Sequence, residues 1–258
     1  MQAAWFESFG PAKDVLQVGE PQAPSPGPGE VLVRMHTSAV NPSDVKKRAG
    51  SFPNLLDDGL VIPNSDGAGV IDAIGEGVDA SRIGERVWLY QAQFARRFGT
   101  AAEYVAIDSQ RAPKLPDNVS FEVGACLGIP VMTSHRAVFA DGDVAGKTIL
   151  ITGGAGRVGY YAIQWANQAG ANVVATASNE ADKSACVAAG AQRVINHRGA
   201  DVVGQIMAAT DGKLVDRVVD VEFGANLPTS IEVLKVGGVI ATYSSTQVPE
   251  PKLPFFRM

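Results

Sequence analysis

The stretch Gly154-Ala155-Gly156-Arg157-Val158-Gly159 decides the fold of this chain. The preceding residues 148–152 are apolar and β-branched and predict a buried strand, while residues 158 to about 168 predict a helix. Between a strand and a helix, G-x-G-x-x-G has a physical explanation. The glycines allow a tight turn, close approach of the backbone to a pyrophosphate, and close packing of the helix on the strand. The free N–H groups at the helix start then face the phosphates. The alternative is a glycine-rich turn of an ordinary α/β domain.

The composition excludes several classes of protein. The 258 residues leave room for two domains or one large one, and an apolar fraction of 46% supports a sizeable core. The net charge of −5 argues against a nucleic-acid or anionic-membrane partner, which usually requires a basic patch. No apolar run reaches the length of a membrane span, and the first residues lack the pattern of a signal peptide. With only Cys126 and Cys186 as cysteines, we expect a cytoplasmic protein.

The chain changes character near residue 120. Before this point, short strands bounded by glycines predict a compact barrel-like fold, and the expected strands are 30–35, 67–75, 86–90 and 102–107. After helical segments at 121–127 and 132–140, strands and helices alternate, which predicts an α/β fold with a parallel, doubly wound sheet. The expected strands are 148–152, 172–176, 193–195, 215–221 and 238–243, and the expected helices are 158–168, 181–189, 201–209 and 227–234.

A series of motifs, in order and spacing, matches a known family from end to end. The motifs are Gly29-Glu30-Val31-Leu32-Val33-Arg34, Asn41-Pro42-Ser43-Asp44, Asn64-Ser65-Asp66-Gly67-Ala68-Gly69-Val70, Gly84-Glu85-Arg86-Val87, Ala102-Glu103-Tyr104, Gly153 to Gly159, Ala189-Gly190-Ala191, Val194-Ile195-Asn196-His197-Arg198 and Gly237-Gly238-Val239-Ile240. In these motifs the chain resembles the zinc-independent quinone oxidoreductase (zeta-crystallin-like) branch of the medium-chain dehydrogenase/reductase superfamily. The resemblance implies a GroES-like β-barrel catalytic domain over residues 1–120 and a Rossmann NADP-binding domain over residues 121–258, with a nicotinamide cofactor between them.

Members of this family typically continue well beyond this length, so we expect the C-terminal part of the Rossmann domain to be missing from this chain. If the strand order is 3-2-1-4-5-6, the strand at 238–243 becomes an open edge, which is an aggregation hazard. Relatives commonly dimerise through an edge strand that would lie beyond residue 258, so we also expect the intact protein, with a longer chain than this one, to be a homodimer.

The resemblance also bears on metal binding. Zinc-dependent relatives carry a cysteine in the segment occupied here by Asn41-Pro42-Ser43-Asp44, and a histidine and usually an acid at Ser65-Asp66. Thiolate and imidazole are the ligands that tetrahedral Zn²⁺ prefers. We therefore expect no metal site, and catalysis that depends on positioning the cofactor against its substrate.

The resemblance assigns residues to the nicotinamide half of the cofactor. Asn41, Asp44 and Thr133 are expected to face the nicotinamide and its ribose, and Ser244 and Ser245 to lie where relatives contact that half. Capping beside Pro42 is the alternative for Asn41 and Asp44. A position at a helix start is the alternative for Thr133.

The proton donor stays open. Lys46 stands where many relatives have a tyrosine, and Phe52 occupies another place that is often tyrosine. Phenylalanine can neither donate a hydrogen bond nor a proton, whereas lysine could act as a cationic electrophile. Tyr90 is a further candidate, and bulk solvent could also supply the proton.

The end of the second Rossmann strand predicts NADPH as the cofactor. An NAD site usually has Asp or Glu there to hold the ribose 2′-hydroxyl, but residues 173–179 contain no acid. Ser178 and Lys183 offer a donor and a positive charge to a 2′-phosphate, and His197 and Arg198 resemble a pair that borders it in relatives. Glu180 and Asp182 count against NADPH if they point inward, and Lys183 and Arg198 could instead be ordinary surface charges.

Together these features predict an enzyme that transfers a hydride from NADPH to a small electrophile, a quinone or an α,β-unsaturated carbonyl. A non-catalytic NADPH-binding redox sensor or crystallin-like protein is the alternative, favoured by the missing tyrosines. A domain of a larger enoyl-reducing assembly is a third reading, without a linker signature to support it.

Overall fold

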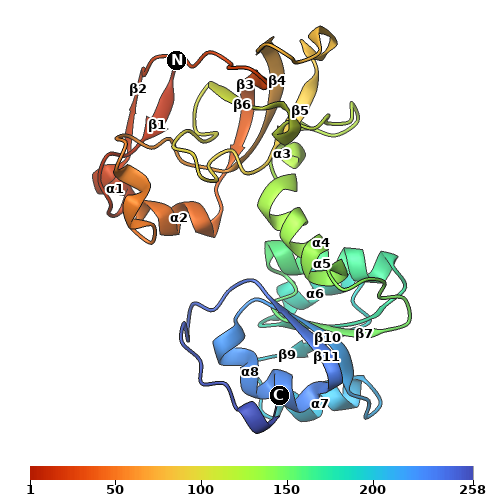
Figure 1. Ribbon diagram of the computed structural model, residues 1–258. Helices are drawn as coiled ribbons and strands as arrows, with labels where there is room; N and C mark the ends of the chain where they lie inside the picture. The colour runs from red at the N-terminus through yellow and green to blue at the C-terminus, as the bar shows by residue number, and fades with distance from the viewer. Residues whose placement is uncertain (258) are drawn as a thin grey trace. The chain divides into compact units, whose positions relative to one another are not determined.

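The computed structural model describes residues 1–257 and divides the chain into two compact units, Met1–Ile129 and Pro130–Met258 (Figure 1). Each unit has its own sheet and its own hydrophobic core. The first is built on antiparallel pairing and the second on parallel pairing, as the change of character near residue 120 predicts.

The first unit contains a four-stranded antiparallel sheet in the order β5-β4-β3-β6. Its strands are β3 (Glu30–Ala39), β4 (Asp66–Ile74), β5 (Arg86–Leu89) and β6 (Tyr104–Asp108). A two-stranded sheet of β1 (Ala3–Trp5) and β2 (Gln17–Gly19) joins this unit through the isolated bridge between Ala3 and Ala102. Buried side chains of one face form the core, among them Val31, Val33, Ile71, Val87, Leu89, Val105 and Ile107. This is the GroES-like arrangement that the sequence predicts.

Three short helices complete the first unit: α1 (Ala12–Val15), α2 (Pro42–Arg48) and α3 (Phe121–Gly124). The sequence analysis expected no helix at 42–48. The helix forms there because Asn41 caps it, Pro42 occupies its first turn, and the side chain of Asp44 accepts a hydrogen bond from the backbone N–H of Asn41.

The second unit is a five-stranded parallel sheet in the order β11-β10-β7-β8-β9, which corresponds to the predicted order 3-2-1-4-5. The strands are β7 (Thr148–Ile151), β8 (Asn172–Ala177), β9 (Arg193–Asn196), β10 (Val215–Asp220) and β11 (Leu234–Thr242). The helices are α4 (Met132–Phe139), α5 (Arg157–Gln168), α6 (Glu180–Ala189), α7 (Val202–Ala209) and α8 (Phe223–Val233). The α/β fold class is therefore confirmed.

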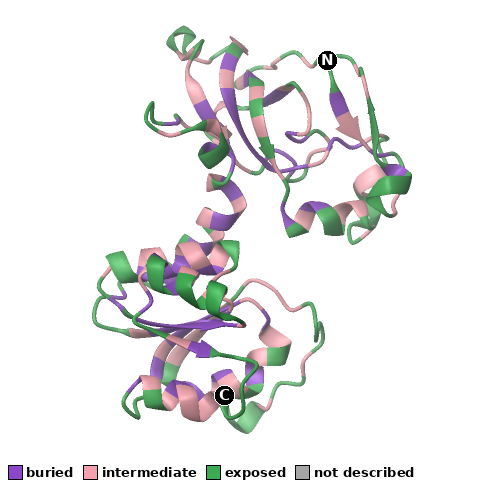
Figure 2. Ribbon diagram, turned by 180° about the vertical axis from the view of Figure 1, so that it is seen from behind, coloured by how far each residue is buried: buried purple, intermediate pink, exposed green. Residues whose placement is uncertain are grey.

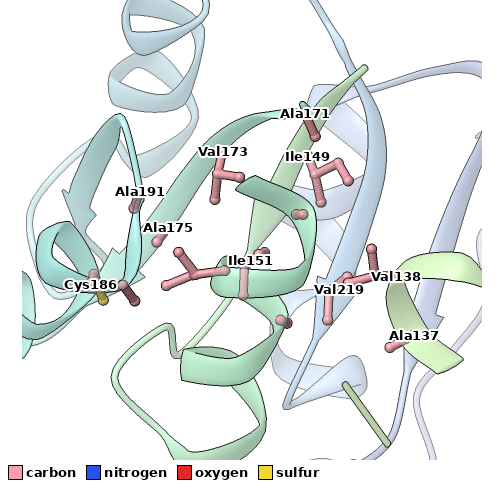
Figure 3. Close-up of a cluster of buried hydrophobic side chains, with 14 of the residues drawn as sticks. Ala137, Val138, Ile149, Ile151, Ala171, Val173, Ala175, Cys186, Ala191 and Val219 are labelled. Atoms are coloured by element: carbon pink, nitrogen blue, oxygen red, sulfur yellow. The ribbon is translucent and has the colours of Figure 1, made fainter. Parts of the chain in front are cut away.

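Helices cover both faces of the parallel sheet, with α4, α5 and α6 on one face and α7 and α8 on the other (Figure 1). The three inner strands β10, β7 and β8 are accordingly buried along most of their length, whereas the edge strands β9 and β11 are more exposed (Figure 2). Alternate residues of β7 pack into the hydrophobic clusters on the two faces of the sheet. Ile149 and Ile151 pack under α5 with Val173, while Leu150 packs on the opposite face (Figure 3).

Charged residues that interrupt β10 in the sequence are paired in the structure. The guanidinium of Arg217 is buried, donates to the carbonyl of Ala137 at 2.9 Å and forms an ion pair with Asp141. Asp216 accepts a hydrogen bond from the backbone N–H of Thr148 at 2.7 Å. The strand is therefore continuous despite its charges.

Several boundaries differ from the prediction: β3 continues to Ala39 instead of ending at 35, and α3 ends at Gly124 instead of 127. Helix α8 begins at Phe223 and not at residue 227. Pro228 favours a start at 227, because proline fits the first turn of a helix best. Strand β11 begins at Leu234, ahead of the Gly237-Gly238 pair, with a register shift in its pairing to β10. Its other side has no partner strand among residues 1–257, so it is the open edge that the sequence predicts.

Candidate functional site

The glycine-rich loop lies between β7 and α5, as predicted. Gly153 takes up a left-handed conformation with φ of 62°, which favours glycine. Its N–H donates to the hydroxyl of Thr176 on β8 at 3.0 Å, and the N–H of Gly154 donates to the carbonyl of Thr176 at 2.9 Å. The turn is thus fixed to the neighbouring strand, and Arg157 and Val158 open α5 with N–H groups that need acceptors outside the helix.

Each glycine of the motif meets a different constraint. A Cβ on Gly154 would lie 2.8 Å from the sulfur of Cys186 and 2.9 Å from the Cβ of Ala175, so this position serves packing. A Cβ on Gly159 would lie 2.4 Å from the carbonyl oxygen of Gly153, so here helix and loop need glycine to approach. A Cβ on Gly156 would lie 3.1 Å from the same oxygen. This oxygen is the one described atom within 4 Å, so a Cβ on Gly156 requires a shift of only a few tenths of an ångström, much less than at Gly154 or Gly159.

Beside this loop, Ser178 and Asn179 follow β8, and His197 and Arg198 follow β9. The structure brings these segments together, because Ala177 pairs with Asn196 and the N–H of His197 donates to the carbonyl of Ala177 at 3.2 Å. Arg198 is exposed next to them. The carboxyl ends of parallel strands are where such folds bind ligands.

The side chains around Ser178 are engaged with one another. Its hydroxyl donates to the carboxylate of Asp182 at 2.9 Å, and the amide of Asn179 donates to the same oxygen at 2.8 Å. Lys183 is half exposed and forms an ion pair with the exposed Glu180 at 3.6 Å. Asp182 therefore places a negative charge against the one hydroxyl that the sequence analysis assigns to a phosphate.

A buried pair that the sequence analysis missed joins the ends of β7 and β10. The hydroxyl of Thr152 donates to the carboxylate of Asp220 at 2.7 Å and accepts from the N–H of Val221 at 3.0 Å. The amide of Asn226 donates to the same oxygen of Asp220 at 2.7 Å, and the other oxygen is buried without a partner among the described residues. In the sequence, Asp220 is visible only as an interruption of an apolar strand.

The remaining predicted residues of this unit lie near strand or helix ends. Thr133 is in the first turn of α4 and is partly buried. Ser244 and Ser245 follow β11, where the hydroxyl of Ser245 accepts from the N–H of Gly224 at 3.0 Å. Glu222 accepts from the N–H groups of the next two loop residues, Thr246 and Gln247, at 2.9 Å each. These contacts hold the loop after β11 against the start of α8.

In the first unit, buried polar groups gather where α2 meets β4. The amide of Asn41 donates to the carboxylate of Asp66 at 2.9 Å, and the N–H of Ile129 donates to the same oxygen at 2.7 Å. Asp44 accepts from the N–H of Asn41 at 2.7 Å. Capping, the alternative that the sequence left open for Asn41 and Asp44, is therefore a role that both have in the structure. Asp66 was not singled out as a functional residue from the sequence.

Burial changes the proton affinities of this cluster. It raises the pKa of Asp66 from 3.8 to about 6, against the opposing effect of the hydrogen bonds from Ile129 and Asn41. It also raises the pKa of Asp44 and lowers the pKa of Lys47, although Asp44 and Asp66 favour the charged form of that lysine. Carboxylates and ammonium thus share a poorly solvated site.

A cavity of about 630 Å³ adjoins this cluster. Its walls are mainly apolar, with Phe52, Pro53, Leu55, Phe94, Ala95 and Ile129, and its polar residues are Ser43, Lys47, Asn54, Ser65, Gln91 and Gln93. The ammonium of Lys47 donates to the backbone carbonyl and to the side-chain oxygen of Gln93, both at 2.9 Å. Such a cavity suits a largely apolar ligand with a polar end.

None of the four candidate residues of the first unit, Asn41, Asp44, Lys46 and Tyr90, is among the residues that line this cavity. Lys46 is exposed on α2. The hydroxyl of Tyr90 donates to the carbonyl of Gln110 at 3.2 Å, and its ring contacts Trp88. Phe52, by contrast, forms part of the wall.

Among residues 1–257, no group of three or more histidine, cysteine, aspartate and glutamate side chains is arranged to hold a metal ion. Within the same part of the chain, no helix has the length and apolar character that crossing a membrane requires.

Two family models match the chain. The alcohol dehydrogenase GroES-like domain matches residues 27–117, and the zinc-binding dehydrogenase family matches residues 158–258. The first match falls in the antiparallel unit. The second begins inside the glycine-rich loop and covers the parallel sheet from there on.

Several relatives with similar sequences are quinone oxidoreductases, and a polyketide synthase subunit from Mycobacterium tuberculosis is 29% identical over 87% of this chain and 10% of its own length. The rat protein is 33% identical over 237 residues, which are 90% of this chain and 69% of the relative. The Pseudomonas aeruginosa protein is 28% identical over 95% of this chain and 73% of the relative.

Solved structures agree with this similarity. A mycobacterial protein complexed with NADPH superposes with a TM-score of 0.86 at 27% identity, covering 100% of this chain and 78% of that one. A quinone oxidoreductase from Pseudomonas syringae gives a TM-score of 0.87 at 27% identity, covering 99% and 77%.

Proposed function

Because this chain belongs to the quinone oxidoreductase branch of the medium-chain dehydrogenase/reductase superfamily, we propose that it reduces quinones or α,β-unsaturated carbonyl compounds with NADPH, without a metal. The observation that supports this most strongly is the glycine-rich loop at the start of α5. There Gly156 leaves its Cα open to a ligand, while Gly154 and Gly159 are required by packing. This cradle fits the pyrophosphate of a dinucleotide.

The proposed binding residues follow from this cradle. The backbone of Gly154 to Gly159, including Ala155, Arg157 and Val158, holds the pyrophosphate. His197 and Arg198 border the adenosine phosphate together with Ser178 and Lys183. Thr133, Ser244 and Ser245 serve the nicotinamide half. The cofactor supplies a hydride when bound, and the chain orients it and excludes water from the reacting atoms.

In this proposal Arg198 determines the preference for NADPH over NADH, because it is an exposed cation that follows β9, and the last residue of β9, Asn196, pairs with Ala177 of β8. The carboxylate of Asp182 opposes this preference, since it occupies the hydroxyl of Ser178. The proposed preference therefore results from cations that outweigh a neighbouring acid.

The cavity of the first unit supports the choice of substrate. Aromatic and aliphatic walls suit a planar ring or an enone, and Ser43, Lys47 and Gln93 supply donors for a carbonyl oxygen. Asn41 and Asp44 then act at the edge of this cavity, held in place by Asp66.

A non-catalytic NADPH-binding role is the second candidate. It is favoured by the exposure of Lys46, which stands where relatives have tyrosine, and by the hydrogen bond that occupies the hydroxyl of Tyr90. Under this alternative the chain binds NADPH but transfers no hydride.

The two candidates are separated by rapid mixing of the NADPH-loaded protein with a panel of quinones and enones, with the absorbance of reduced nicotinamide as the readout. The Gly156→Ala variant, which should bind the cofactor about 10- to 150-fold more weakly, is the control for reaction in free solution. Oxidation of bound NADPH by at least one acceptor supports the reductase. Tight binding of NADPH without oxidation across the panel supports the alternative and refutes the reductase.

A further inference from the structure

Two side chains that line the cavity of the first unit carry buried donors without a partner among the described residues. The side chain of Gln93 is 2% exposed, and its amide nitrogen has no hydrogen-bond partner among the described residues. The buried hydroxyl of Ser43 also has no hydrogen-bond partner among the described residues. Unsatisfied buried donors are costly, and they are usually explained by a ligand or an ordered water that satisfies them.

Lys47 lies in the same cavity and is oriented by Gln93. Two of its three N–H groups are accounted for by the backbone carbonyl and the side-chain oxygen of Gln93. This contact also fixes the orientation of the Gln93 amide, because the oxygen must face the ammonium. Lys47 lines the cavity together with Ser43 and Gln93, and its remaining N–H group is the donor that we assign to a ligand there.

We propose that Lys47 hydrogen-bonds to the carbonyl oxygen of the substrate and gives it a proton, with Gln93 as the residue that positions the ammonium. This proposal rests on the reductase function proposed above and names the proton donor that the sequence left open. It also defines the substrate as a carbonyl compound whose ring or chain packs against Phe52, Phe94 and Ile129.

The proton and electron balance is simple. An enone accepts a hydride from NADPH at its β-carbon, and the electron pair of its C=C bond moves so that negative charge develops on the carbonyl oxygen. An Nζ–H bond of Lys47 breaks with its electron pair left on nitrogen, and an O–H bond forms. The neutral amine then regains a proton from water. A quinone accepts the hydride at one carbonyl oxygen, the electron pairs of the ring shift so that negative charge develops on the opposite oxygen, and that oxygen accepts the proton of Lys47 to give the hydroquinone.

The surroundings suit Lys47 to this role. Burial lowers its pKa, which makes proton transfer at neutral pH easier than from an exposed lysine. Asp44 on α2 and Asp66 on β4 are the charged groups that face it and favour its charged form, while the cavity segments around Phe52 and Gln93 contribute neutral side chains. Lys46, its neighbour, is exposed and does not line the cavity.

The test compares Lys47→Met with Lys13→Met, a matched change at an exposed lysine of α1. We expect Lys47→Met to lower kcat/KM for quinones and enones by about 100-fold or more, as the loss of a general acid does, with the Kd for NADPH unchanged. The pH profile of kcat/KM should lose its fall at alkaline pH, which reports the deprotonation of Lys47. Lys13→Met should behave as the parent.

Gln93→Glu keeps the proposal testable if Lys47→Met does not fold. A carboxylate beside the ammonium should raise the pKa of Lys47 and move the alkaline fall by about one pH unit or more toward higher pH. An unchanged profile in this variant, full activity in Lys47→Met, or a loss confined to Lys46→Met overturns the role of Lys47. If the parent itself oxidises no NADPH with any acceptor, the proposed reductase fails as well, and the two failures are therefore distinguishable.

Discussion

Gly156 and Gly159 form a matched pair, because the same added methyl group meets different surroundings at the two positions. At Gly156 the backbone has φ −68° and ψ 159°, which any residue adopts, and the new Cβ would lie 3.1 Å from the Gly153 carbonyl. Alanine is less favourable than glycine at a helix N-cap by about 1 kcal/mol. Alanine also makes the unfolded chain less flexible, which stabilises the folded state by about 0.4–1 kcal/mol. The free energy of unfolding of Gly156→Ala should therefore change by less than about 1 kcal/mol.

At Gly159 the Cβ would lie 2.4 Å from the Gly153 carbonyl oxygen and 2.9 Å from the Cα of Gly154. Both are backbone atoms, so helix and loop must move apart. Overpacking of this severity costs about 3 kcal/mol, and the better helix propensity of alanine offsets about 1 kcal/mol of it. Gly159→Ala should thus lose about 2 kcal/mol of stability in denaturant unfolding.

Cofactor binding should show the opposite pattern. The methyl group of Gly156→Ala occupies the space proposed for the pyrophosphate and removes at least one charge-assisted hydrogen bond, worth about 1.5–3 kcal/mol. This corresponds to a loss of about 10- to 150-fold in affinity for NADPH, measured by fluorescence titration. If Gly156→Ala binds NADPH as tightly as the parent, the pyrophosphate does not lie at this loop and the reasoning is wrong.

Four further predictions follow from the site. Lys183→Ala and Arg198→Ala should each lower the affinity for NADPH about 10- to 100-fold and leave the affinity for NADH nearly unchanged. Asp182→Asn should instead raise the affinity for NADPH. Parallel titrations that show equal effects on both cofactors contradict the assignment of these residues. The pKa of Asp66 is higher in the folded than in the unfolded state, so its protonated carboxyl stabilises the fold fully below pH 3.8. About 3 kcal/mol of this stability is lost as the pH rises through about 6. Asp66→Asn should make the free energy of unfolding depend less on pH in this range, and an unchanged dependence contradicts the raised pKa of Asp66. Elemental analysis after dialysis should find no stoichiometric zinc, and one zinc per chain contradicts the metal-free mechanism. Light scattering should show a dimer, and a stable monomer contradicts this expectation.

The architecture could be predicted because its signals are local in the sequence. Continuous apolar runs such as 149–151, punctuated by glycines and followed by helical patterns, specify covered parallel strands, and the alternation of strand and helix specifies their order. The glycine-rich loop was recognisable for the same reason. Its strand, turn and helix occupy consecutive residues, and the requirement for glycine at Gly154 and Gly159 is visible as steric contact in the structure.

The polar cluster of the first unit could not be predicted, because it depends on contacts between distant segments. Lys47 and Gln93 are 46 residues apart, and Asp66 meets Ile129 across 63 residues. No periodicity reports such pairings. The sequence therefore directed attention to Lys46, by comparison with tyrosine in relatives, whereas the neighbouring Lys47 lines the cavity. Asp220 could not be recognised for a related reason. In the sequence it is an acid that interrupts an apolar strand, and its hydrogen bonds with Thr152 and Asn226 are visible only in the structure.

The most direct test of the proposed reductase follows the hydride itself. The protein, freed of metal by a chelator, is mixed with an α,β-unsaturated ketone and NADPH that carries deuterium on the transferable position of its nicotinamide, and the product is analysed by mass spectrometry and NMR. We predict that deuterium appears on the β-carbon of the product, where it cannot exchange with water, and that Gly156→Ala forms far less labelled product at an NADPH concentration near the Kd of the parent. Bound NADPH that keeps its deuterium in the presence of every quinone and enone tested, or label transfer that requires an added metal ion, would contradict the account.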